Sequence, residues 1–581
     1  MGKATQALQE WASSYGPVFV WYMGRKPCIV LSDPELVRQA AITNFQHLQD
    51  RSMFQICPGM AIEAEFMNKG LFASQGKDWT HARAILQQFF TRDELIKHTH
   101  KMNFSADRLL AFLATSASAG DEFEATYTFS KMTMEVIGTT AFGVDFHLQH
   151  EDIANSKTPS PSLSSSSGSA SINYGFNVLS AARSLFQPLG LRGNKARIVL
   201  GLAPLLGWVQ RRGVAIGGRV KALKTISLAR CFIWGILHGI LENSYDVDSI
   251  ERIGMANKNR AETTGTGTAT ATGASQDKTQ NPDDGQWPIL SQCPMHTLGK
   301  IRGKSFNKGK QSLKNVAPES SALFKLFQDA VNPETDKPFT EFDICAQGFN
   351  IIVGAYETTA LGLSFTLYEL AKQPELQRRI AKEVATLRVF KKNKPSKRTR
   401  AAAAKDLEEA SPSSLPLDIS FEDLKYLPFT EACFLEGLRL WPPASSLIPM
   451  SRHAKEDVTL DGYKIPKGAC VMFNVWHVHH NSEYYPSPEK YTPDRFLSDH
   501  PEMKIRERQA FLPFGAGPRK CIGKAFAIAE AVIALAKMLE QFEFRVDMAR
   551  SAELDIISSA TLQPVNGIWL KVFKREEESS C

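Results

Sequence analysis

One stretch of fourteen residues, 511–524, constrains this chain more than any other. It reads Phe-Leu-Pro-Phe-Gly-Ala-Gly-Pro-Arg-Lys-Cys-Ile-Gly-Lys, and an apolar run of helical length follows it. The three glycines permit positive φ angles and close backbone approach, and each proline removes an N–H, so we expect a tight loop beneath a flat ligand. Cys521 stands where the helix begins. There, the positive end of the helix dipole and loop N–H groups aimed at sulfur favour a thiolate.

The order Phe514-x-x-Gly517-x-Arg519-x-Cys521-x-Gly523 resembles the haem-ligand signature of the cytochrome P450 family. The resemblance implies that Cys521 is the axial thiolate of haem iron, and that Phe514 and Arg519 belong to the haem-binding loop. A lone cysteine is more commonly a small buried hydrophobic residue. We read six other cysteines in that way: Cys28, Cys57, Cys231, Cys345, Cys433 and Cys470.

Length and composition predict a globular protein. The chain has 581 residues, of which 43% are hydrophobic, and its nine unevenly spaced cysteines fit neither a metal knuckle nor a disulfide framework. A reducing compartment is therefore expected. The net charge of +7 suits an acidic protein partner or an anionic membrane face. Nucleic acid is disfavoured as a partner, because no stripe of base-stacking aromatic residues accompanies the basic runs.

The N-terminal residues are polar and contain neither a signal-peptide core nor an apolar segment of membrane-spanning length. Membrane-bound members of the family that the chain resembles usually begin with such an anchor. We therefore expect a cytoplasmic protein, or one held at the surface of the endoplasmic reticulum membrane by other means, or a truncated N-terminus.

Composition also predicts a single domain over residues 1–581 with low-complexity insertions near 155–175, 255–318 and 388–416. The basic run in the third insertion is read as a solvated loop rather than a targeting patch. Apolar clusters in residues 176–241 are punctuated by Arg and Lys. They predict either amphipathic helices that lie on a membrane and cover an apolar pocket, or simple core helices.

Trp79 and Arg83 are four residues apart and share one face of an expected helix. The pair alone would favour an ordinary amphipathic helix. Because it matches the Trp-x-x-x-Arg of the family's third helix, the resemblance implies contact with a haem propionate. Arg452 resembles a second position that contacts a propionate.

Residues 354–359 read Gly-Ala-Tyr-Glu-Thr-Thr, within an apolar helix that we expect to begin at a Thr340 capping box. Threonines beside a carboxylate are poor choices for a buried helix unless the backbone opens locally and their side chains face something polar. The run resembles the family's oxygen-binding helix, which implies proton-relay roles for Glu357 and Thr358. It departs from the family pattern at Ala355, where glycine is usual.

Glu436 and Arg439 are three residues apart on an expected helix. An exposed pair would contribute only ~0.3–0.5 kcal/mol. The Glu-x-x-Arg pattern, with Arg495 in a later Pro-x-Arg-Phe, resembles the family's buried ion-pair network and implies a structural role.

Several local patterns predict the remaining elements. Residues 17–22 and 27–31 predict one β-hairpin, and residues 463–468 and 470–475 predict another. A capping box over residues 32–35 predicts a helix through about Ile42. The crowded His477, His479 and His480 are typical of a metal site, but we favour an ordinary strand-to-helix turn.

The resemblance covers most of the chain outside the insertions. It implies a mainly α domain with a small β-sheet region and haem b between the Thr358 helix and the Cys521 loop. The implied reaction inserts one oxygen atom from O₂ into an apolar organic substrate, with electrons from NADPH delivered by a partner reductase. Two alternatives stay open: an isomerase or dehydratase on the same fold that needs neither O₂ nor reductase, and a haem-binding protein without catalysis.

Basic residues near the cysteine predict where an acidic reductase would dock. The alternative is a set of independently solvated charges. These residues are Lys504, Arg506, Arg508, Lys520 and Lys524.

Overall fold

The computed structural model describes ten stretches of the chain: residues 4–23, 26–51, 68–149, 322–328, 330–332, 337–393, 417–444, 450–497, 510–558 and 561–575. The first two expected insertions and the amphipathic stretch 176–241 lie outside these residues. In the third insertion, helix α15 (Pro374–Asn393) continues through residues 388–393, which were expected to be irregular. Its last turn is held by Lys391, whose Nζ lies 2.6 Å from Asp423 Oδ2.

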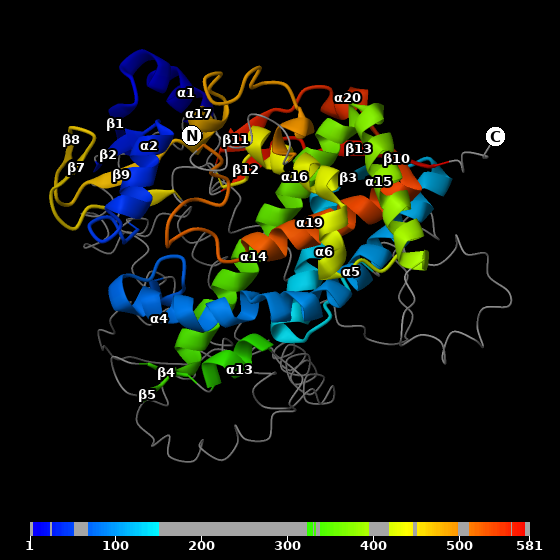
Figure 1. The fold of residues 1–581 in the computed structure, drawn as a ribbon, viewed down its shortest axis with the longest axis horizontal. Coiled ribbons are helices and arrows are strands. Elements are labelled where there is room, and N and C mark those ends of the chain that lie inside the picture. The colour runs from blue at the N-terminus through cyan, green and yellow to red at the C-terminus, as the bar shows by residue number, and fades with distance from the viewer. Residues whose placement is uncertain are drawn as a thin grey trace, which may run out of the picture.

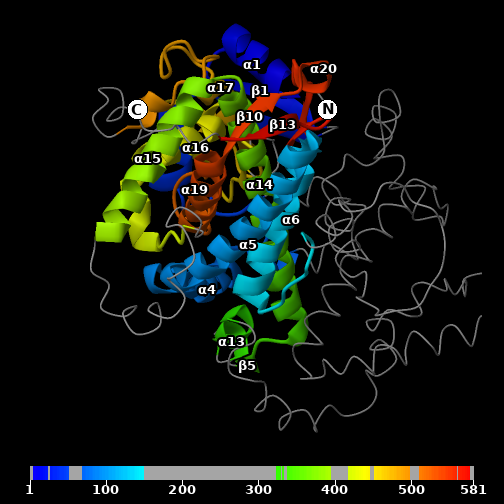
Figure 2. The same ribbon diagram turned by 90° about the vertical axis from the view of Figure 1, so that its right-hand side faces the viewer.

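The long helix α14 (Glu341–Ala371) runs through the middle of the helical bundle, as Figures 1 and 2 show. It begins at the predicted capping box, where the Asp343 N–H donates to Thr340 Oγ1 at 3.2 Å. Helices α6 (Ala125–Ile137), α16 (Pro428–Leu440) and α19 (Lys524–Gln541) pack against it. Because neighbours cover it from several sides, its C-terminal half is apolar around most of its circumference.

Further helices surround this core. They include α4 (Gly76–Gln87), α5 (Arg92–Ala119) and α13 (Ala322–Gln328). Helix α1 (Ala4–Tyr15) packs beside the N-terminal sheet, and α17 (Val475–His479) and α20 (Met548–Ser551) are short. No helix in the described stretches is long and apolar enough to cross a membrane.

The N-terminal sheet confirms the first predicted hairpin. Strands β1 (Val18–Met23) and β2 (Lys26–Leu31) pair antiparallel. The sheet continues with β9 (Cys470–Phe473) and β6 (Ser451–His453), in the order β1-β2-β9-β6. Figure 1 shows this sheet at one end of the molecule, away from α5 and α15.

The helix that follows β2 extends to Thr43, as α2 (Pro34–Arg38) and a π-helical turn, η1 (Gln39–Thr43). Its cap is Asp33 rather than Ser32. The Asp33 carboxylate accepts hydrogen bonds from two first-turn N–H groups at 2.8 and 3.0 Å. A carboxylate one residue nearer to the helix is thus the effective cap.

The hairpin predicted over residues 463–475 is wrong. Strand β8 (Tyr463–Ile465) pairs with the earlier strand β7 (Val458–Leu460), and β9 joins the N-terminal sheet. The turn between β7 and β8 contains Asp461 and Gly462, with φ angles of 44° and 81°. Asp-Gly is a preferred pair for a two-residue turn with both φ angles positive, so local turn chemistry selects the earlier strand as partner.

Smaller sheets lie elsewhere. A C-terminal sheet has the order β10 (Phe542–Val546), β13 (Trp569–Lys574), β3 (Glu122–Glu124). Two hairpins complete the described strands, β11 (Ile556–Ser558) with β12 (Leu562–Pro564) and β4 (Val331–Asn332) with β5 (Lys337–Pro338). The chain is therefore mainly helical with small sheets, as predicted.

Candidate functional site

The cysteine loop, residues 510–523, folds as tightly as its sequence predicts. Gly515 and Gly517 have φ angles of 70° and 69°, in the region that favours glycine. A Cβ at Gly517 would lie 1.9 Å from the Ala41 carbonyl oxygen, so the backbone of η1 touches the loop there. Gly523 was expected to share the positive φ and does not: its φ is −91°, in the last position before α19.

Cys521 lies just before α19 and lines a cavity of about 340 Å³. Its N–H donates to the Phe514 carbonyl at 2.7 Å, which fixes the turn. Burial raises the pKa of the Cys521 thiol, and the Gly523 N–H and the charges of Arg83 and Arg51 lower it in part. The side chain is accessible through the cavity although protein atoms surround it on its other sides.

Helix α14 forms a largely apolar wall of the cavity through Phe349, Ile351, Val353 and Ala355. At Gly354, an added Cβ would meet nothing within 4 Å, so the helix faces open space there. The backbone remains regularly α-helical through this run.

The two predicted relay residues occupy different positions. Thr358 lines the cavity, and its hydroxyl donates to the Gly354 carbonyl at 2.7 Å. Glu357 is 5% exposed and is not among the residues that line the cavity. Its carboxylate accepts hydrogen bonds from Thr561 Oγ1 at 3.2 Å and from Gln563 Nε2 at 2.9 Å.

The fold brings together Trp79, Arg83, Arg452 and Arg519, all of which line the cavity. The Arg519 guanidinium stacks over the Trp79 indole at 4.2 Å and donates to two backbone carbonyls at 2.8 and 3.0 Å. Arg83 donates to the Lys520 carbonyl at 2.7 Å. Arg452 is 2% exposed and donates to a neighbouring backbone carbonyl at 2.9 Å.

Sequence reasoning missed Arg51, which also lines the cavity. Its guanidinium lies over the Phe72 ring at 4.2 Å and donates to the Phe72 carbonyl at 3.1 Å. The Nε atoms of Arg51 and Arg452 are buried without a hydrogen-bond partner among the described residues. Arg51 stands in no motif that the sequence analysis used, so only its place in space reveals it.

These four arginines, Arg51, Arg83, Arg452 and Arg519, form the arginine cluster, which carries excess positive charge. Within the described stretches, its one ion pair joins Arg519 to Asp50 at 3.5 Å. Burial, reinforced by the neighbouring guanidinium groups, lowers the pKa of Arg51 to about 10, that of Arg519 to about 9, and that of Arg452 well below its ordinary value. Buried charges and unpartnered donors are costly unless paired, so the cluster suits a ligand that carries carboxylates.

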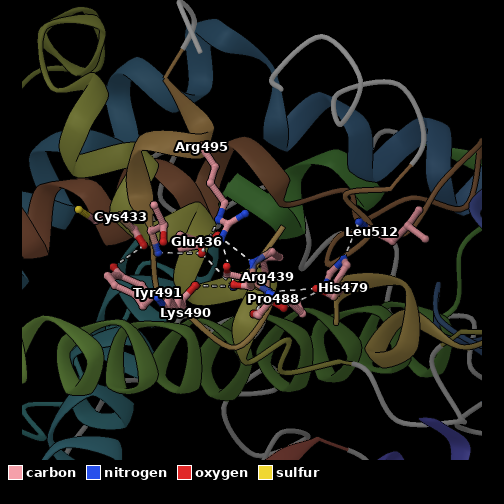
Figure 3. A network of polar contacts seen from close by, with 11 residues as sticks. Cys433, Glu436, Arg439, His479, Pro488, Lys490, Tyr491, Arg495 and Leu512 are labelled. Atoms are coloured by element: carbon pink, nitrogen blue, oxygen red, sulfur yellow. Dashed lines mark hydrogen bonds and ion pairs between the residues drawn. The ribbon is translucent and has the colours of Figure 1, made fainter. Parts of the chain in front are cut away.

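The predicted network of Glu436, Arg439 and Arg495 is present (Figure 3). Arg439 Nε and Nη2 donate to the Glu436 carboxylate at 2.8 and 2.9 Å, and Arg495 Nε lies 3.3 Å from the same carboxylate. Both partners of the first pair are fully buried. The remaining Arg439 donors reach the carbonyls of His479, Pro488 and Lys490 at 3.0, 2.7 and 3.1 Å.

His479 connects this network to the cysteine loop (Figure 3). Its Nδ1 donates to the Arg439 carbonyl at 3.1 Å, and its Nε2 accepts from the Leu512 N–H at 2.9 Å. Burial lowers the pKa of His479 well below its ordinary value. The ring is therefore neutral, as an accepting nitrogen requires. Of the crowded histidines, His480 is likewise bonded to backbone, through Nδ1 and the Trp476 carbonyl at 2.9 Å.

Comparison with known proteins now identifies the family. The family model described as Cytochrome P450 matches residues 2–185 and 295–571. The chain is a cytochrome P450. Membership implies a haem cofactor and supports an enzyme of the oxidoreductase class.

Two kinds of relative are similar to this cytochrome P450. Thromboxane-A synthase of Rattus norvegicus is 24% identical over 565 residues, which is 97% of this chain and 86% of the relative. Thromboxane-A synthase of Mus musculus gives the same identity over 566 residues. Cytochrome P450 4F12 of Homo sapiens is 39% identical over 241 residues, which is 41% of this chain and 40% of the relative.

The cavity residues fit the haem that this family implies. Cys521 offers a thiolate, the soft ligand that haem iron takes in such proteins. The arginine cluster offers more positive charge than Asp50 compensates, which suits the two propionates of a haem. The Nε atoms of Arg51 and Arg452, which have no hydrogen-bond partner in the described part of the chain, could donate to such carboxylates.

Proposed function

We propose that this cytochrome P450 is a haem-thiolate monooxygenase that inserts one oxygen atom of O₂ into an apolar organic substrate. Cys521 would hold the haem iron through its thiolate, Arg51, Arg83 and Arg452 would bind the propionates, and α14 and the cysteine loop would enclose the group. Arg519, Trp79 and Phe514 support the group as walls of the cavity. When bound, haem b supplies iron that activates O₂, and the thiolate donates electron density that favours O–O cleavage.

The observation that carries this proposal is Thr358. Thr358 places a hydroxyl on the largely apolar wall that α14 forms. The preceding residue, Glu357, is buried and does not line the cavity. Monooxygenation releases water and consumes protons in every turnover, whereas the rearrangement of a peroxide consumes no net proton. Hydroxyl and carboxylate groups that hold and pass protons at the cavity are therefore useful to the first reaction and unnecessary for the second.

A second candidate is an isomerase or dehydratase that works without a reductase. What favours it is similarity over 97% of the chain to proteins named thromboxane-A synthase. The polar pair on α14 favours the monooxygenase.

We infer that electrons come from NADPH through a reductase that docks beside the cysteine loop. Lys520 and Lys524 are exposed there and provide positive charge for an acidic partner. Lys504, Arg506 and Arg508, predicted to extend this patch, lie outside the described residues. We also propose one domain over residues 1–581, associated with the surface of the endoplasmic reticulum membrane or cytoplasmic.

The test uses haem-loaded protein, a reductase, NADPH and isotopically labelled O₂. Apolar compounds are first screened for a shift of the haem Soret band, and those that bind are offered as substrates. Label in the product supports the monooxygenase. Turnover of an organic peroxide without NADPH or O₂ would contradict the monooxygenase and support the isomerase. Binding of compounds without turnover of any of them would support a haem-binding protein without catalysis.

The ligand is tested separately with Cys521→Ala. This variant should lose the strongly red-shifted Soret band of the reduced carbon monoxide complex. Cys345→Ala is the control, because Cys345 is buried on α14 and does not line the cavity. A Cys521→Ala protein that keeps this band would contradict the assignment of Cys521 as the thiolate ligand of haem iron.

A further inference from the structure

The hairpin β11–β12 brings a further threonine to the cavity. Thr561 stands just before β12, is 3% exposed and lines the cavity together with Thr358. Its position is fixed from its own strand, since the Leu562 N–H donates to the Pro443 carbonyl at 2.8 Å. Thr561 therefore has a fixed position in the cavity wall, although it is far from the α14 motif in sequence.

Thr561 is bonded to the carboxylate that α14 turns away from the cavity. Thr561 Oγ1 donates to Glu357 Oε2 at 3.2 Å, and Gln563 Nε2 donates to Glu357 Oε1 at 2.9 Å. Gln563 Nε2 also donates to Thr561 Oγ1 at 3.3 Å. The three side chains close a small ring of hydrogen bonds, of which Thr561 is the member that reaches the cavity.

We propose that Thr561 is the relay residue through which Glu357 exchanges protons with the cavity. A hydroxyl both donates and accepts, and its hydrogen rotates to suit its partners. When Glu357 is protonated, its O–H bond breaks as a new O–H bond forms at Thr561 Oγ1, and the original Thr561 proton passes to an acceptor in the cavity. One proton moves, no electron is transferred, and Glu357 is left as a carboxylate that the Thr561 hydroxyl again stabilises.

Gln563 is a positioning residue in this arrangement. Its amide cannot readily carry the proton, but it binds both oxygen-bearing partners and so holds Glu357 Oε2 towards Thr561. Its strand is held in turn, because Gln563 pairs with Ile557 in the hairpin. The backbone pairing thus sets the distance across which the proton moves.

This inference rests on the proposed monooxygenase function, because a reaction without net proton uptake would not need the relay. The decisive variants are Thr561→Val, which keeps the shape and removes the hydroxyl, and Thr561→Ser, which restores it. Thr366→Val is the matched control, since Thr366 is a fully buried threonine of α14 that does not line the cavity and whose hydroxyl has no hydrogen-bond partner among the described residues. All three are made in the full-length, haem-loaded protein.

Two measurements are combined. In turnover with NADPH and reductase, Thr561→Val should slow product formation by roughly 10-fold or more and divert electrons to hydrogen peroxide, since positioned proton donors contribute about 100- to 10,000-fold. Its solvent deuterium isotope effect should change as well. In infrared spectra of the resting protein, the carboxyl bands assigned by their loss in Glu357→Gln should shift in Thr561→Val. Thr561→Ser should restore both properties.

The outcomes separate the two hypotheses. If wild-type protein fails to couple O₂ and NADPH to product, the monooxygenase function fails and the relay falls with it. If wild-type protein is coupled and Thr561→Val behaves like Thr366→Val, only the relay is overturned. A band shift in Thr561→Val without any loss of coupling would reduce Thr561 to a structural neighbour of Glu357, which also overturns the proposal.

Discussion

Replacing Glu436 by alanine should leave little folded, haem-loaded protein. The buried Arg439 guanidinium directs two of its donors at Glu436, at 2.8 and 2.9 Å, and would keep its charge without a counterion. The Thr492 N–H, 2.9 Å from Glu436 Oε1, would lose its acceptor, and the Arg495 guanidinium, whose Nε lies 3.3 Å from the same oxygen, would lose this ion-pair partner. Breaking a buried pair costs about 3–5 kcal/mol, against a total stability of about 5–15 kcal/mol.

The matched control is Glu375→Ala. Glu375 pairs with Arg378 at the same three-residue spacing on α15, at 2.5 Å, but the two side chains are 78% and 52% exposed. Exposed pairs contribute little, so this variant should unfold like wild type. The assay is the free energy of unfolding in urea, with the haem content of each preparation. A Glu436→Ala protein that loses less than ~1 kcal/mol, binds haem fully and differs only in turnover would refute the structural role.

Three further predictions use the same preparations. Thr358→Ala should bind haem and substrate normally but release more peroxide per NADPH; unchanged coupling would remove Thr358 from proton handling. Lys520→Glu with Lys524→Glu should slow the first electron transfer in stopped-flow experiments. The slowing should shrink with salt, since the Debye length is ~8–10 Å near physiological ionic strength, and a rate indifferent to both excludes this docking face. Burial lowers the pKa of His98 to about 4 from an ordinary 6.5. The unfolded state therefore binds more protons between these values, and stability is lost as the pH falls from 6.5 towards 4. His98→Phe should reduce this loss, and an unchanged pH dependence of the unfolding free energy would contradict the prediction.

Local sequence signals predicted the parts of the fold that depend on near neighbours. The Thr340 capping box needs residues only three apart, and the β1–β2 hairpin needs only adjacent runs, so both were found. Glu436 and Arg439 share one helical face by their spacing, and their buried network with Arg495 was predicted from the resemblance to the family pattern. The failure at residues 463–475 was also local, since Asp461 and Gly462 carry a hairpin signal that was not weighed.

The residues that were missed act through distant partners. Arg51 contributes to the site because the chain returns beside Cys521 and Arg519, more than 400 residues later. His479 joins α16 to the cysteine loop by bonds to Arg439 and Leu512, and neither bond follows from the histidine spacing that drew attention to it. Thr561 precedes a strand with no motif of its own. Such roles depend on the tertiary fold, which local patterns do not specify.

The contact between the cysteine loop and the N-terminal segments has a consequence for how the protein is made. Arg519 Nε bonds to the carbonyl of Gln49, 470 residues earlier, and Gly517 touches Ala41. At about 5–20 residues per second, a ribosome needs roughly 25–95 s to make the 470 residues that separate these two groups. During that time the N-terminal segments lack this partner, and we expect the cofactor to be captured only after the cysteine loop has been synthesised. In a cell that lacks haem, we therefore expect newly made chains to accumulate in which the cysteine loop and the N-terminal segments have not packed around the cofactor.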